Sequence, residues 1–440
     1  MIITFIGHGY VGLVSAAVFA DLGNTVWVIG HTPEKIENLK RGIIPIYEPG
    51  LEELVKRNLK AKRLLFTLDY NPAIAESDVI FIAVGTPSSE NGQADLSVVF
   101  NVAEKIGRNL EKYSIVITKS TVPVGTNKRI KKIIEKSKPK NIEFDIASAP
   151  EFLREGQAIS DTRNPDRIII GTNEKKAEKF LVELHSPLVT KEEKINSRII
   201  LCNIETAEMI KYASNAFLAT KISFANAISH LAERTGADGL KVLQAVGVDK
   251  RIGPAFLNAG AGYGGSCFPK DVKALIAIAK DHEYDFNLLK EVQKINQDAM
   301  LLIIRKAQRL LKNDLKNKTI TVFGLAFKPD TDDMRDAPAI TIIRGLLCLG
   351  AKIRAYDPIA MKNAQKIFAK EKNIEFSQDL YKTVENADLL IILTEWNEFQ
   401  QLNLKKIKNL MKAPNIIDGR NIYDPDIVKS LGFNYIGVGR

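Results

Sequence analysis

The chain has 440 residues, of which 45% are hydrophobic, 26% charged and 7% aromatic, and these proportions exclude a disordered, collagen-like or disulfide-stapled chain. At roughly 100–200 residues per domain, the length predicts two to four domains that each bury a core. The 62 Lys and Arg residues exceed the 52 Asp and Glu residues, which gives a net charge of +10 and favours an anionic partner. Because no aromatic residues interleave with the basic runs, an anionic small molecule is a more favoured ligand than a nucleic acid.

Short apolar runs rich in Ile and Val alternate with helical patterns through the first part of the chain. The runs lie at residues 2–6, 25–29, 64–68, 79–84, 115–118 and 144–147. Strands that are apolar on both faces and separated by amphipathic helices are typical of a mostly parallel sheet covered on each side. The sequence therefore predicts an α/β domain at the start of the chain.

A long helix is predicted next, because residues 203–234 contain neither Pro nor Gly and Gly236 follows. At roughly 1.5 Å per residue this helix would be close to 50 Å long, a length that usually connects domains or packs against a partner subunit. Further helices are predicted at 239–246 and 288–311, and strands at 319–323, 352–356, 388–393 and 415–417.

The predicted fold class is α/β, with two Rossmann-like doubly wound parallel-sheet domains joined by a helical central domain with a long connecting helix. The predicted domains are residues 1–200, 201–312 and 313–440. Ligands of open parallel sheets bind beyond the carboxyl ends of the strands, so the active cleft is expected between the two α/β domains.

A glycine-rich loop, Gly7 to Gly12, follows the first predicted strand and precedes a helix predicted at residues 13–22. A G-x-G-x-x-G string in that place allows a tight turn and lets a pyrophosphate approach the N–H groups of a helix N-terminus. A purely structural Gly-rich turn is the alternative. We interpret the loop as part of a dinucleotide site.

The second strand ends in Gly30, where such domains usually carry an acidic residue that binds the ribose hydroxyls of NAD. Loss of the carboxylate removes a repulsion toward a 2′-phosphate, which Thr32 and Lys35 could contact, so NADP or dual use is one hypothesis. The other hypothesis is that backbone groups and Lys35 hold the ribose of NAD, and it is preferred because no Arg lies near in the sequence.

Cys267 lies in a glycine-rich string from residue 260 to residue 271. A Cys is most often a small buried hydrophobe. Here the glycines permit close backbone approach, and Lys270 and Asp271 supply a cation and a proton acceptor beside the sulfur. Cys267 is therefore a candidate nucleophile.

Polar residues at helical spacing mark two further places. Lys211 and Asn215 share one face of the long helix and could form an interhelix contact or supply a cation and an amide donor to an oxyanion. Glu151 and Glu155 follow a strand end at the same spacing, with surface helix charge as the alternative. Thr121 follows another strand end and offers a hydroxyl.

The three cysteines form no CxxC pair and no Cys/His cluster, which favours a reducing compartment and argues against a structural zinc site. Cys202 and Cys348 lie in apolar sequence that is helical or starts a helix, and are interpreted as structural. No apolar run reaches the roughly 18 residues of a membrane span, and the N-terminus lacks a signal-peptide pattern. No membrane partner is expected, and the cytoplasm is the expected location.

Together these motifs resemble the nucleotide-sugar dehydrogenase family over essentially the whole chain, and most closely its UDP-glucose branch. The strings that carry the resemblance are GHGYVGLV from Gly7, IPIYEPGLEEL from Ile44, VGTPSSENGQADLS from Val84, KSTVPVGT from Lys119, APEFLREG from Ala149, KYASNAFLATKISFANAI from Lys211, RIGPAFLNAGAGYGGSCFPKD from Arg251, FGLAFKPDTDDMRDAP from Phe323 and IIDGRNIY from Ile416. Gly30 is the clearest departure, because the family normally carries Asp there. His8, at a position that is often small or polar, is a lesser one.

The resemblance implies two successive hydride transfers from C6 of UDP-glucose to two dinucleotides, which gives UDP-glucuronate. Cys267 would trap the intermediate aldehyde as a thiohemiacetal, which is oxidised to a thioester and then hydrolysed. Asp271 would act with Thr121 through an ordered water in proton transfer. Lys211 and Asn215 would stabilise oxyanions, and Glu151 would assist the hydrolytic water.

The resemblance also implies the binding residues. The cofactor contacts would be Gly7, Gly9, Val11, Gly12, Gly30, Lys35, Thr86, Thr121, Glu155, Lys270 and Arg335. The nucleotide sugar would be held by Glu151, Phe152, Leu153, Lys211, Asn215, Phe256, Leu257, Asn258, Gly260, Gly264, Phe327, Lys328 and Arg420. Arg251 would reach the substrate of a neighbouring subunit, so a homodimer through the central helix is expected, with a higher oligomer also open.

Three alternatives stay open. The same chemistry could act on GDP-mannose, UDP-N-acetylmannosamine or UDP-N-acetylglucosamine. The chain could instead be an ordinary two-electron dehydrogenase in which Cys267 is a bystander, or a nucleotide-binding protein without turnover. Turnover with each sugar nucleotide distinguishes the substrates, and the number of cofactors reduced per sugar distinguishes the four-electron from the two-electron reaction.

Overall fold

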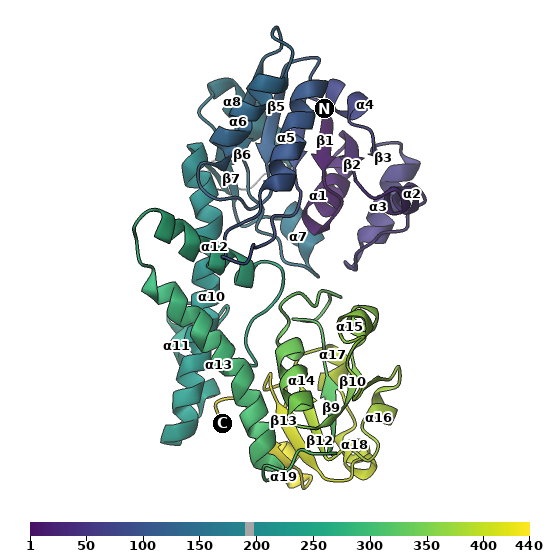
Figure 1. Cartoon of the computed structure of the whole chain (residues 1–440), viewed down its shortest axis with the longest axis vertical. Coiled ribbons are helices and arrows are strands. Elements are labelled where there is room, and N and C mark those ends of the chain that lie inside the picture. Colours follow the sequence, from purple (N-terminus) through teal and green to yellow (C-terminus); the bar gives the residue numbers. More distant parts are fainter. Residues whose placement is uncertain (190–197) are drawn as a thin grey trace. The chain divides into compact units, whose positions relative to one another are not determined.

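The computed structural model describes residues 1–189 and 198–440. The chain divides into two compact units, residues 1–214 with 273–283 and residues 215–272 with 284–440. Each unit contains a mostly parallel sheet with helices on both faces (Figure 1). The predicted α/β class with two Rossmann-like domains is therefore confirmed, while the three predicted domain bounds stay a prediction.

The N-terminal unit is built on a sheet of eight strands in the order β3-β2-β1-β4-β5-β6-β7-β8. The strands are β1 Ile2–Ile6, β2 Thr25–Ile29, β3 Leu64–Thr67, β4 Val79–Ile82, β5 Ser114–Thr118, β6 Phe144–Ser148, β7 Ile168–Gly171 and β8 Ile199–Cys202. Neighbouring strands are parallel except β6 and β7. The order of the first six is that of a dinucleotide-binding fold, in which the ligand lies beyond the carboxyl ends of β1 and β4.

The helices of this unit cover the sheet. They are α1 Tyr10–Asp21, α2 Pro33–Lys40, α3 Leu51–Lys60, α4 Asn71–Ala75, α5 Ser97–Asn109, α6 Thr126–Ser137, α7 Ala158–Arg163 and α8 Lys175–His185, with a 3-10 turn η1 at Ser186–Leu188. The first helix begins three residues before the predicted start, because Gly9 is extended and forms its N-cap. Cys202 is the last residue of β8 and lies two residues before α10 begins, so its predicted place at the entry to a helix is correct to within two residues.

The second unit contains a six-stranded, wholly parallel sheet in the order β11-β10-β9-β12-β13-β14. The strands are β9 Thr319–Phe323, β10 Lys352–Tyr356, β11 Ile374–Phe376, β12 Leu389–Ile392, β13 Asn415–Asp418 and β14 Asn434–Ile436. Its helices are α14 Pro338–Cys348, α15 Met361–Ile367, α16 Leu380–Thr383, α17 Asn397–Gln400, α18 Leu404–Leu410 and α19 Pro425–Ser430. The strand order repeats that of the first six strands of the N-terminal unit.

Four helices make up the middle of the chain: α10 Ile204–Thr235, α11 Gly239–Val248, α12 Phe268–Asp281 and α13 Asn287–Leu310. The 32 residues of α10 agree with the predicted long helix to within one residue at each end. Glu233 of α10 accepts hydrogen bonds from Lys306 Nζ of α13 at 2.7 Å and from Gly439 N–H at 2.7 Å, which attaches both segments to the long helix. Among the residues that the structure describes, no helix is long and apolar enough to cross a membrane.

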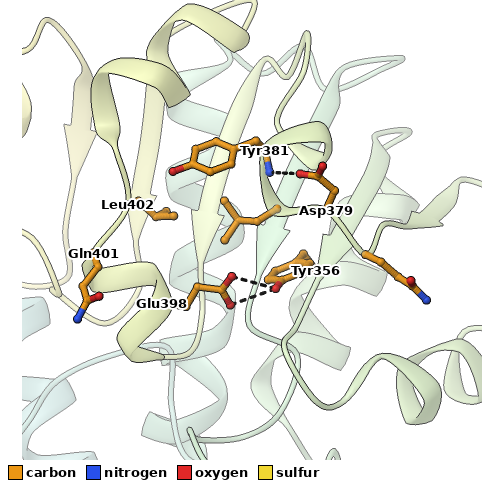
Figure 2. A pocket seen from close by; sticks show the side chains of 8 residues that line it. Tyr356, Asp379, Tyr381, Glu398, Gln401 and Leu402 are labelled. Carbon is orange, nitrogen blue, oxygen red and sulfur yellow. Dashed lines mark hydrogen bonds between the residues drawn. The ribbon is translucent and has the colours of Figure 1, made fainter.

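A pocket of about 490 Å³ lies in the second unit, where β10 ends. Figure 2 shows the Tyr356 hydroxyl pointing at Glu398, to whose two carboxylate oxygens it lies at 3.0 and 3.1 Å. Asp379 accepts a hydrogen bond from Tyr381 N–H at 2.9 Å and caps α16. None of the predicted site residues lines this pocket.

Candidate active site

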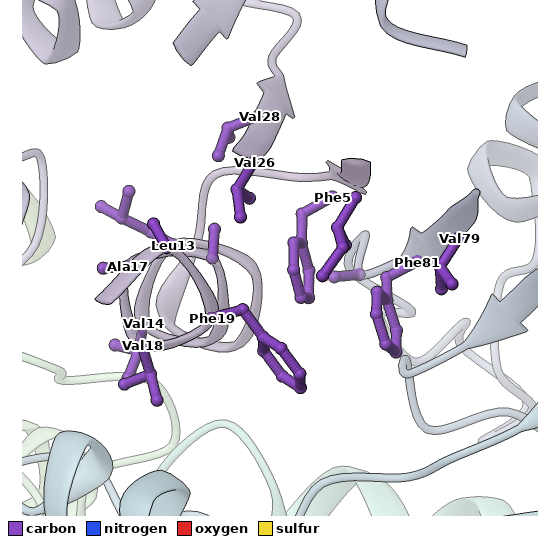
Figure 3. Packing of buried hydrophobic residues seen from close by; sticks show 14 of the residues in the cluster. Phe5, Leu13, Val14, Ala17, Val18, Phe19, Val26, Val28, Val79 and Phe81 are labelled. Carbon is purple, nitrogen blue, oxygen red and sulfur yellow. The ribbon is translucent and has the colours of Figure 1, made fainter. Parts of the chain in front are cut away.

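The glycine-rich loop is held in place by the packing of α1. This helix is buried from Gly12 to Ala20, so it is apolar on all sides. Its Phe19 packs against Phe5 of β1 and Phe81 of β4, whose rings stack with centroids 4.5 Å apart and planes at 6° (Figure 3). The helix start, and with it the loop, is therefore fixed relative to the sheet.

Two glycines of this loop leave no room for a side chain. Gly7 has φ +123°, and a Cβ there would lie 2.3 Å from the Ala83 carbonyl oxygen. A Cβ on Gly12 would lie 2.1 Å from the Gly7 carbonyl oxygen. The chain can therefore turn this tightly only with glycine at both positions.

The space beside Gly9 is open, because a Cβ there would meet no atom within 4 Å. Gly9 forms the N-cap of α1 without a side-chain cap, and the first turn carries no acidic residue. A helix N-terminus with unobstructed N–H groups binds phosphate groups well. Gly7, Gly9 and Gly12 thus form a cradle that fits a dinucleotide pyrophosphate.

Hydroxyl groups connect the ends of β4 and β5. Thr86 Oγ1 donates to the Thr121 carbonyl oxygen at 2.9 Å, and Ser120 Oγ donates to the Val84 carbonyl oxygen at 2.7 Å. The structure therefore brings the predicted residues Thr86 and Thr121 together at the carboxyl end of the sheet. Thr121 lies in the N-terminal unit and Asp271 in the second, so their predicted partnership stays a prediction.

Glu151 and Lys211 form a buried ion pair. Lys211 Nζ lies 3.2 Å from Glu151 Oε1, and their side chains are 4% and 8% exposed. The second oxygen, Oε2, accepts a hydrogen bond from Leu153 N–H at 2.6 Å. Lys211 also lies over the Phe152 ring, 5.1 Å from its centroid. The pair places a carboxylate and an ammonium group together in a site of low polarity.

Lys119 is a third charged group near this pair, and the sequence did not single it out. It directly follows β5, and its Nζ lies 5.9 Å from the centroid of the Phe81 ring. The pKa of Lys119 is lowered to about 8, mainly by burial; Glu151 acts in the opposite direction and Lys211 adds to the lowering. The signal in the sequence was a lysine immediately after five buried strand residues.

The segment after β6 is not a helix, so the alternative that Glu151 and Glu155 are surface helix charges is wrong. Both residues are buried, with Glu155 9% exposed. The turn is organised by Glu48, whose Oε2 and Oε1 accept hydrogen bonds from Gly156 N–H at 2.6 Å and Ala158 N–H at 2.7 Å. Glu48 is thus a positioning residue that the sequence reasoning missed.

In the second unit, two asparagines fix the glycine-rich loop before Cys267. Asn296 of α13 accepts from Tyr263 N–H at 2.7 Å and donates to the Tyr263 carbonyl oxygen at 3.0 Å. Asn226 of α10 accepts from Gly260 N–H at 2.8 Å. Both are polar residues at buried positions of helices, which was the available sequence signal.

The same loop packs tightly against the segment after β9. A Cβ on Gly264 would lie 2.3 Å from the Asp336 carbonyl oxygen, and a Cβ on Gly265 would lie 2.8 Å from the Phe327 ring. Gly265 N–H donates to the Arg335 carbonyl oxygen at 2.8 Å. The predicted substrate residue Phe327 therefore lies against Gly265, the neighbour of the predicted substrate residue Gly264.

Cys267 directly precedes α12, and its carbonyl oxygen accepts the Asp271 N–H at 2.8 Å. Its Sγ lies 3.5 Å from Ser266 Oγ. The fully buried Asp271 binds Asn215 Nδ2 through Oδ2 and Lys270 Nζ through Oδ1, both at 2.5 Å. The first turn of α12 thus carries a carboxylate and an ammonium group, directly after the Cys267 thiol, and the carboxylate binds the Asn215 amide of α10.

Three arginines that are predicted to bind ligand form hydrogen bonds or ion pairs with other residues of the protein. Arg420 Nε donates to the Leu393 carbonyl oxygen at 2.8 Å and lies 3.3 Å from a Glu395 oxygen. Arg335 pairs with Asp333 at 2.7 Å, with its side chain 60% exposed. Arg251 pairs with Asp249 at 2.6 Å.

The remaining predicted substrate residues differ in exposure. Lys328 lies over the Phe327 ring, 5.5 Å from its centroid. Leu257 is buried and Asn258 is exposed. Phe256 has φ +64°, a left-handed conformation that is uncommon for a bulky residue and that often marks ligand-binding loops. No group of three or more His, Cys, Asp or Glu able to hold a metal occurs within residues 1–189 and 198–440.

A dinucleotide cradle, a charged cluster at the sheet edge and a cysteine at a helix N-terminus together define a dehydrogenase of the Rossmann class. Domain models of the UDP-glucose/GDP-mannose dehydrogenase family match the chain in three places: the NAD binding domain at residues 1–189, the central domain at 205–298 and the UDP binding domain at 321–425. The chain belongs to the UDP-glucose/GDP-mannose dehydrogenase family.

Two curated relatives match over the whole of this chain. The UDP-glucose 6-dehydrogenase TuaD of Bacillus subtilis is 48% identical, with 100% of this chain and 93% of that protein covered. The UDP-glucose 6-dehydrogenase of Rhizobium meliloti is 45% identical, with 100% of each covered.

Solved structures of nucleotide-sugar dehydrogenases are also similar to this chain. A UDP-glucose dehydrogenase from Pyrobaculum islandicum matches with a TM-score of 0.91 and 36% identity over 99% of this chain and 97% of that one. A UDP-N-acetylmannosamine dehydrogenase from Pyrococcus horikoshii matches with a TM-score of 0.86 and 29% identity, over 100% of this chain and 99% of that one.

Proposed function

We propose that the chain oxidises C6 of UDP-glucose to the carboxylate of UDP-glucuronate, a four-electron reaction that passes through a covalent adduct on Cys267. The observation that carries the proposal is the cluster in the first turn of α12, where Asn215 and Lys270 both bind the buried Asp271 beside the thiol. A thiol in this setting can act as a nucleophile, because a helix N-terminus and a nearby ammonium group both stabilise a thiolate.

The thiol solves a chemical difficulty of the second oxidation. The first oxidation removes a hydride and a proton from the CH₂OH group and leaves an aldehyde. Attack by the Cys267 sulfur forms a C–S bond and gives a tetrahedral thiohemiacetal, whose C–H bond can again release a hydride. The product is a thioester, and water then cleaves the C–S bond to give the carboxylate and regenerate the thiol.

Asp271 and Asn215 would manage charge at the reacting carbon. Asn215 has an amide donor that can bind an oxyanion, and it is oriented by its hydrogen bond to Asp271. Asp271 would accept the proton from the sugar hydroxyl, with Thr121 and a water molecule as its relay. Lys211, one helical turn before Asn215 on α10, would add a positive charge that stabilises the same oxyanion.

Glu151 would direct the water in thioester hydrolysis. Its Oε2 is fixed by the Leu153 N–H and its Oε1 by Lys211, so the carboxylate is oriented by the protein before substrate binds. Lys119 would share in this step, because burial brings its pKa to about 8 and it can gain or lose a proton near neutral pH. A positioned base contributes typically 10²–10⁴-fold to such a step.

The dinucleotide would be NAD, bound by Gly7, Gly9, Val11 and Gly12, and when bound it would supply the hydride acceptor for each oxidation. The open space at Gly9 and the uncapped start of α1 support this assignment. The further cofactor contacts would be Gly30, Lys35, Thr86, Thr121, Glu155, Lys270 and Arg335.

UDP-glucose is proposed as the sugar nucleotide because the two curated relatives at 48% and 45% identity are UDP-glucose 6-dehydrogenases. The relative named for UDP-N-acetylmannosamine is less similar, at 29% identity. Its substrate and GDP-mannose stay as alternative substrates for the same chemistry. The tight loop around Gly264, with Phe256 in its strained conformation, would hold the sugar nucleotide.

A homodimer is proposed as the working unit, because α10 carries an exposed apolar stripe. Phe217, Phe224 and Leu231 are 65%, 49% and 56% exposed and follow one another at intervals of seven residues, which is two helical turns. A second copy of the chain that packs against this stripe would bury it, and Arg251 would then reach the partner's substrate. The cytoplasm is the proposed location, since the mechanism needs a reduced thiol.

The test is a stoichiometric assay with UDP-glucose and NAD. Two cofactors reduced per sugar are expected, and one per sugar would refute the four-electron route. Cys267→Ser should abolish formation of the acid, because a serine alkoxide is far harder to form near neutral pH. Cys348→Ser, at the exposed end of α14, is the matched control and should retain full activity.

A further inference from the structure

The end of β2 is the part of the cofactor site where this chain departs most from its family. We use "ribose corner" for the group of His8, Gly30, His31, Thr32 and Lys35 in the N-terminal unit. In an NAD-binding domain a carboxylate usually occupies the Gly30 position and binds the ribose hydroxyls. Here the position is buried and bears no side chain.

The structure leaves no space in which that carboxylate could be restored. A Cβ on Gly30 would lie 2.4 Å from Ile36 Cδ1 and 3.1 Å from His8 Nδ1. Ile36 is 1% exposed and belongs to the core cluster beneath α2, so it cannot move away at little cost. The residues packed around Gly30 therefore occupy the space that an acidic side chain would need, so a substitution at position 30 alone would not restore the carboxylate.

His8 presents a polar atom to this place. The residue is only 6% exposed, and its Nδ1 has no hydrogen-bond partner. Because the Cβ of a side chain at position 30 would lie 3.1 Å from Nδ1, that atom points at the place that the family's carboxylate would start from. A buried imidazole nitrogen without a partner is costly, which makes a ligand atom its natural partner.

The groups around His8 are a second imidazole and a lysine. The His31 ring lies with its centroid 5.0 Å from that of His8. Burial first, and then the charges of His31 and Lys35, lower the pKa of His8 to about 4, so its ring is neutral at pH 7 and has one N–H to donate. Lys35 lies in α2, whose N-cap residue, Thr32, makes no side-chain hydrogen bond to the helix. Glu34 in the first turn of α2 is exposed.

We propose that the ribose corner binds the 2′-phosphate of an adenine dinucleotide, so that the enzyme accepts NADP as well as NAD. His8, His31 and Lys35 provide hydrogen-bond donors and positive charge, and no carboxylate remains at position 30 to repel a phosphate dianion. Lys binds phosphate as a point charge, so the absence of a nearby Arg does not prevent recognition. The inference rests on the proposed function, because it assumes that the Gly7–Gly12 loop holds a dinucleotide.

The test is calorimetric and needs no turnover. Adenosine 2′,5′-bisphosphate and adenosine 5′-monophosphate are titrated into the full-length protein. The bisphosphate is expected to bind at least tenfold more tightly, and the preference should fall as salt is added, since His31 and Lys35 are exposed. Equal affinities for the two nucleotides would overturn the proposal and leave the dinucleotide site intact. Failure of both to bind would refute the site and the proposal together.

Variants identify the groups responsible. Lys35→Ala and His31→Ala should each reduce the preference for the bisphosphate over the monophosphate at least threefold. His8→Phe keeps a ring of similar shape, removes Nδ1 and should do the same. Lys40→Ala, at the exposed far end of α2, removes an equal charge and is the matched control. A preference unchanged by Lys35→Ala and His31→Ala would contradict the assignment.

One further titration separates the dinucleotide's own phosphate from a free anion. Both nucleotides are titrated again in the presence of inorganic phosphate. If the corner binds the 2′-phosphate of the cofactor, inorganic phosphate should weaken the binding of the bisphosphate more than that of the monophosphate, with which it competes only at the Gly7–Gly12 cradle. Equal weakening of the two nucleotides would overturn the proposal.

Discussion

Replacing Lys119 by Met should make the protein more stable at neutral pH while it impairs catalysis. Lys119 lies near the buried Glu151 and Lys211 pair, and burial lowers its pKa from 10.5 to about 8. A lysine whose pKa is lower in the folded state is held in its charged form at a cost in free energy. Groups that do chemistry often impose such a cost on the fold.

The size of the effect follows from the two pKa values. Each pKa unit corresponds to about 1.4 kcal/mol, so the fall from 10.5 to about 8 costs on the order of 3 kcal/mol at pH 7. Met has a similar length and no charge. Lys119→Met should therefore raise the free energy of unfolding by up to about 3 kcal/mol at pH 7, less what is lost in packing.

The pH dependence tests the cause. Between pH 8 and 10.5 the unfolded state binds more protons at this lysine than the folded state, so the wild-type protein gains stability from it as the pH rises. The advantage of Lys119→Met should accordingly shrink above pH 8 and vanish above 10.5. Urea unfolding followed by circular dichroism, on both proteins at pH 7 and at pH 10.5, measures this difference.

Lys132→Met is the control, because Lys132 is exposed on α6 and its replacement should change stability by less than about 0.5 kcal/mol. A Lys119→Met variant that is no more stable at pH 7, or whose advantage is the same at both pH values, would refute the account of a strained buried charge.

Three further outcomes are expected. Lys211→Met leaves the Glu151 carboxylate buried without the cation that pairs with it. We therefore expect the free energy of unfolding to fall by about 3–5 kcal/mol and kcat to fall by about 10²–10³-fold. Unfolding curves equal to those of the wild type would contradict the buried ion pair. Gly264→Ala places a Cβ 2.3 Å from the Asp336 carbonyl oxygen, so calorimetry should find sugar-nucleotide binding weakened at least tenfold and dinucleotide binding unchanged; weakening of both would point to general misfolding. Phe217→Asp puts a charge in the apolar stripe of α10 and should convert the dimer to monomer in sedimentation velocity, whereas an unchanged sedimentation coefficient would place the interface elsewhere.

Most strands that the sequence predicts are buried on both faces, as β4 and β5 are, although burial alternates along the predicted β3 and β10. Those it misses include the edge strands β8, β11 and β14, which have four, three and three residues. An edge strand contacts one neighbour and has a partly exposed face. β11 and β14 accordingly contain polar residues, whereas β8 is apolar in sequence but is buried only at its first residue, Ile199. The missed β7 is different, because residues 168–171 are all buried and carry the same apolar signal as the strands that were found.

The candidate site is predictable to the extent that its residues lie in short strings. The Gly7–Gly12 loop and the segment around Cys267 could be located because glycines and reactive groups are adjacent in the sequence. Lys119 and Glu48 could not be assigned a role in this way. The role of each depends on partners far along the chain, Glu151 for the one and Gly156 for the other, which only the fold brings near.

The His8 position illustrates the same limit. From the sequence alone, a histidine between two glycines could either clash with its surroundings or contact the pyrophosphate. The structure shows that its Nδ1 faces Gly30. The two residues are close because β1 and β2 are neighbouring parallel strands and the loops that follow them begin side by side.

Efforts to engineer this enzyme toward other sugars face a restriction at the glycines before the cysteine. Gly264 lies so close to the Asp336 backbone, and Gly265 so close to the Phe327 ring, that neither position has room for a side chain. Glycine is already the smallest residue, so neither position can be changed to a smaller one. Libraries that randomise these two positions would yield mostly inactive clones. Diversity is better directed to side chains such as Phe256 and Asn258, which can change in size without moving the main chain.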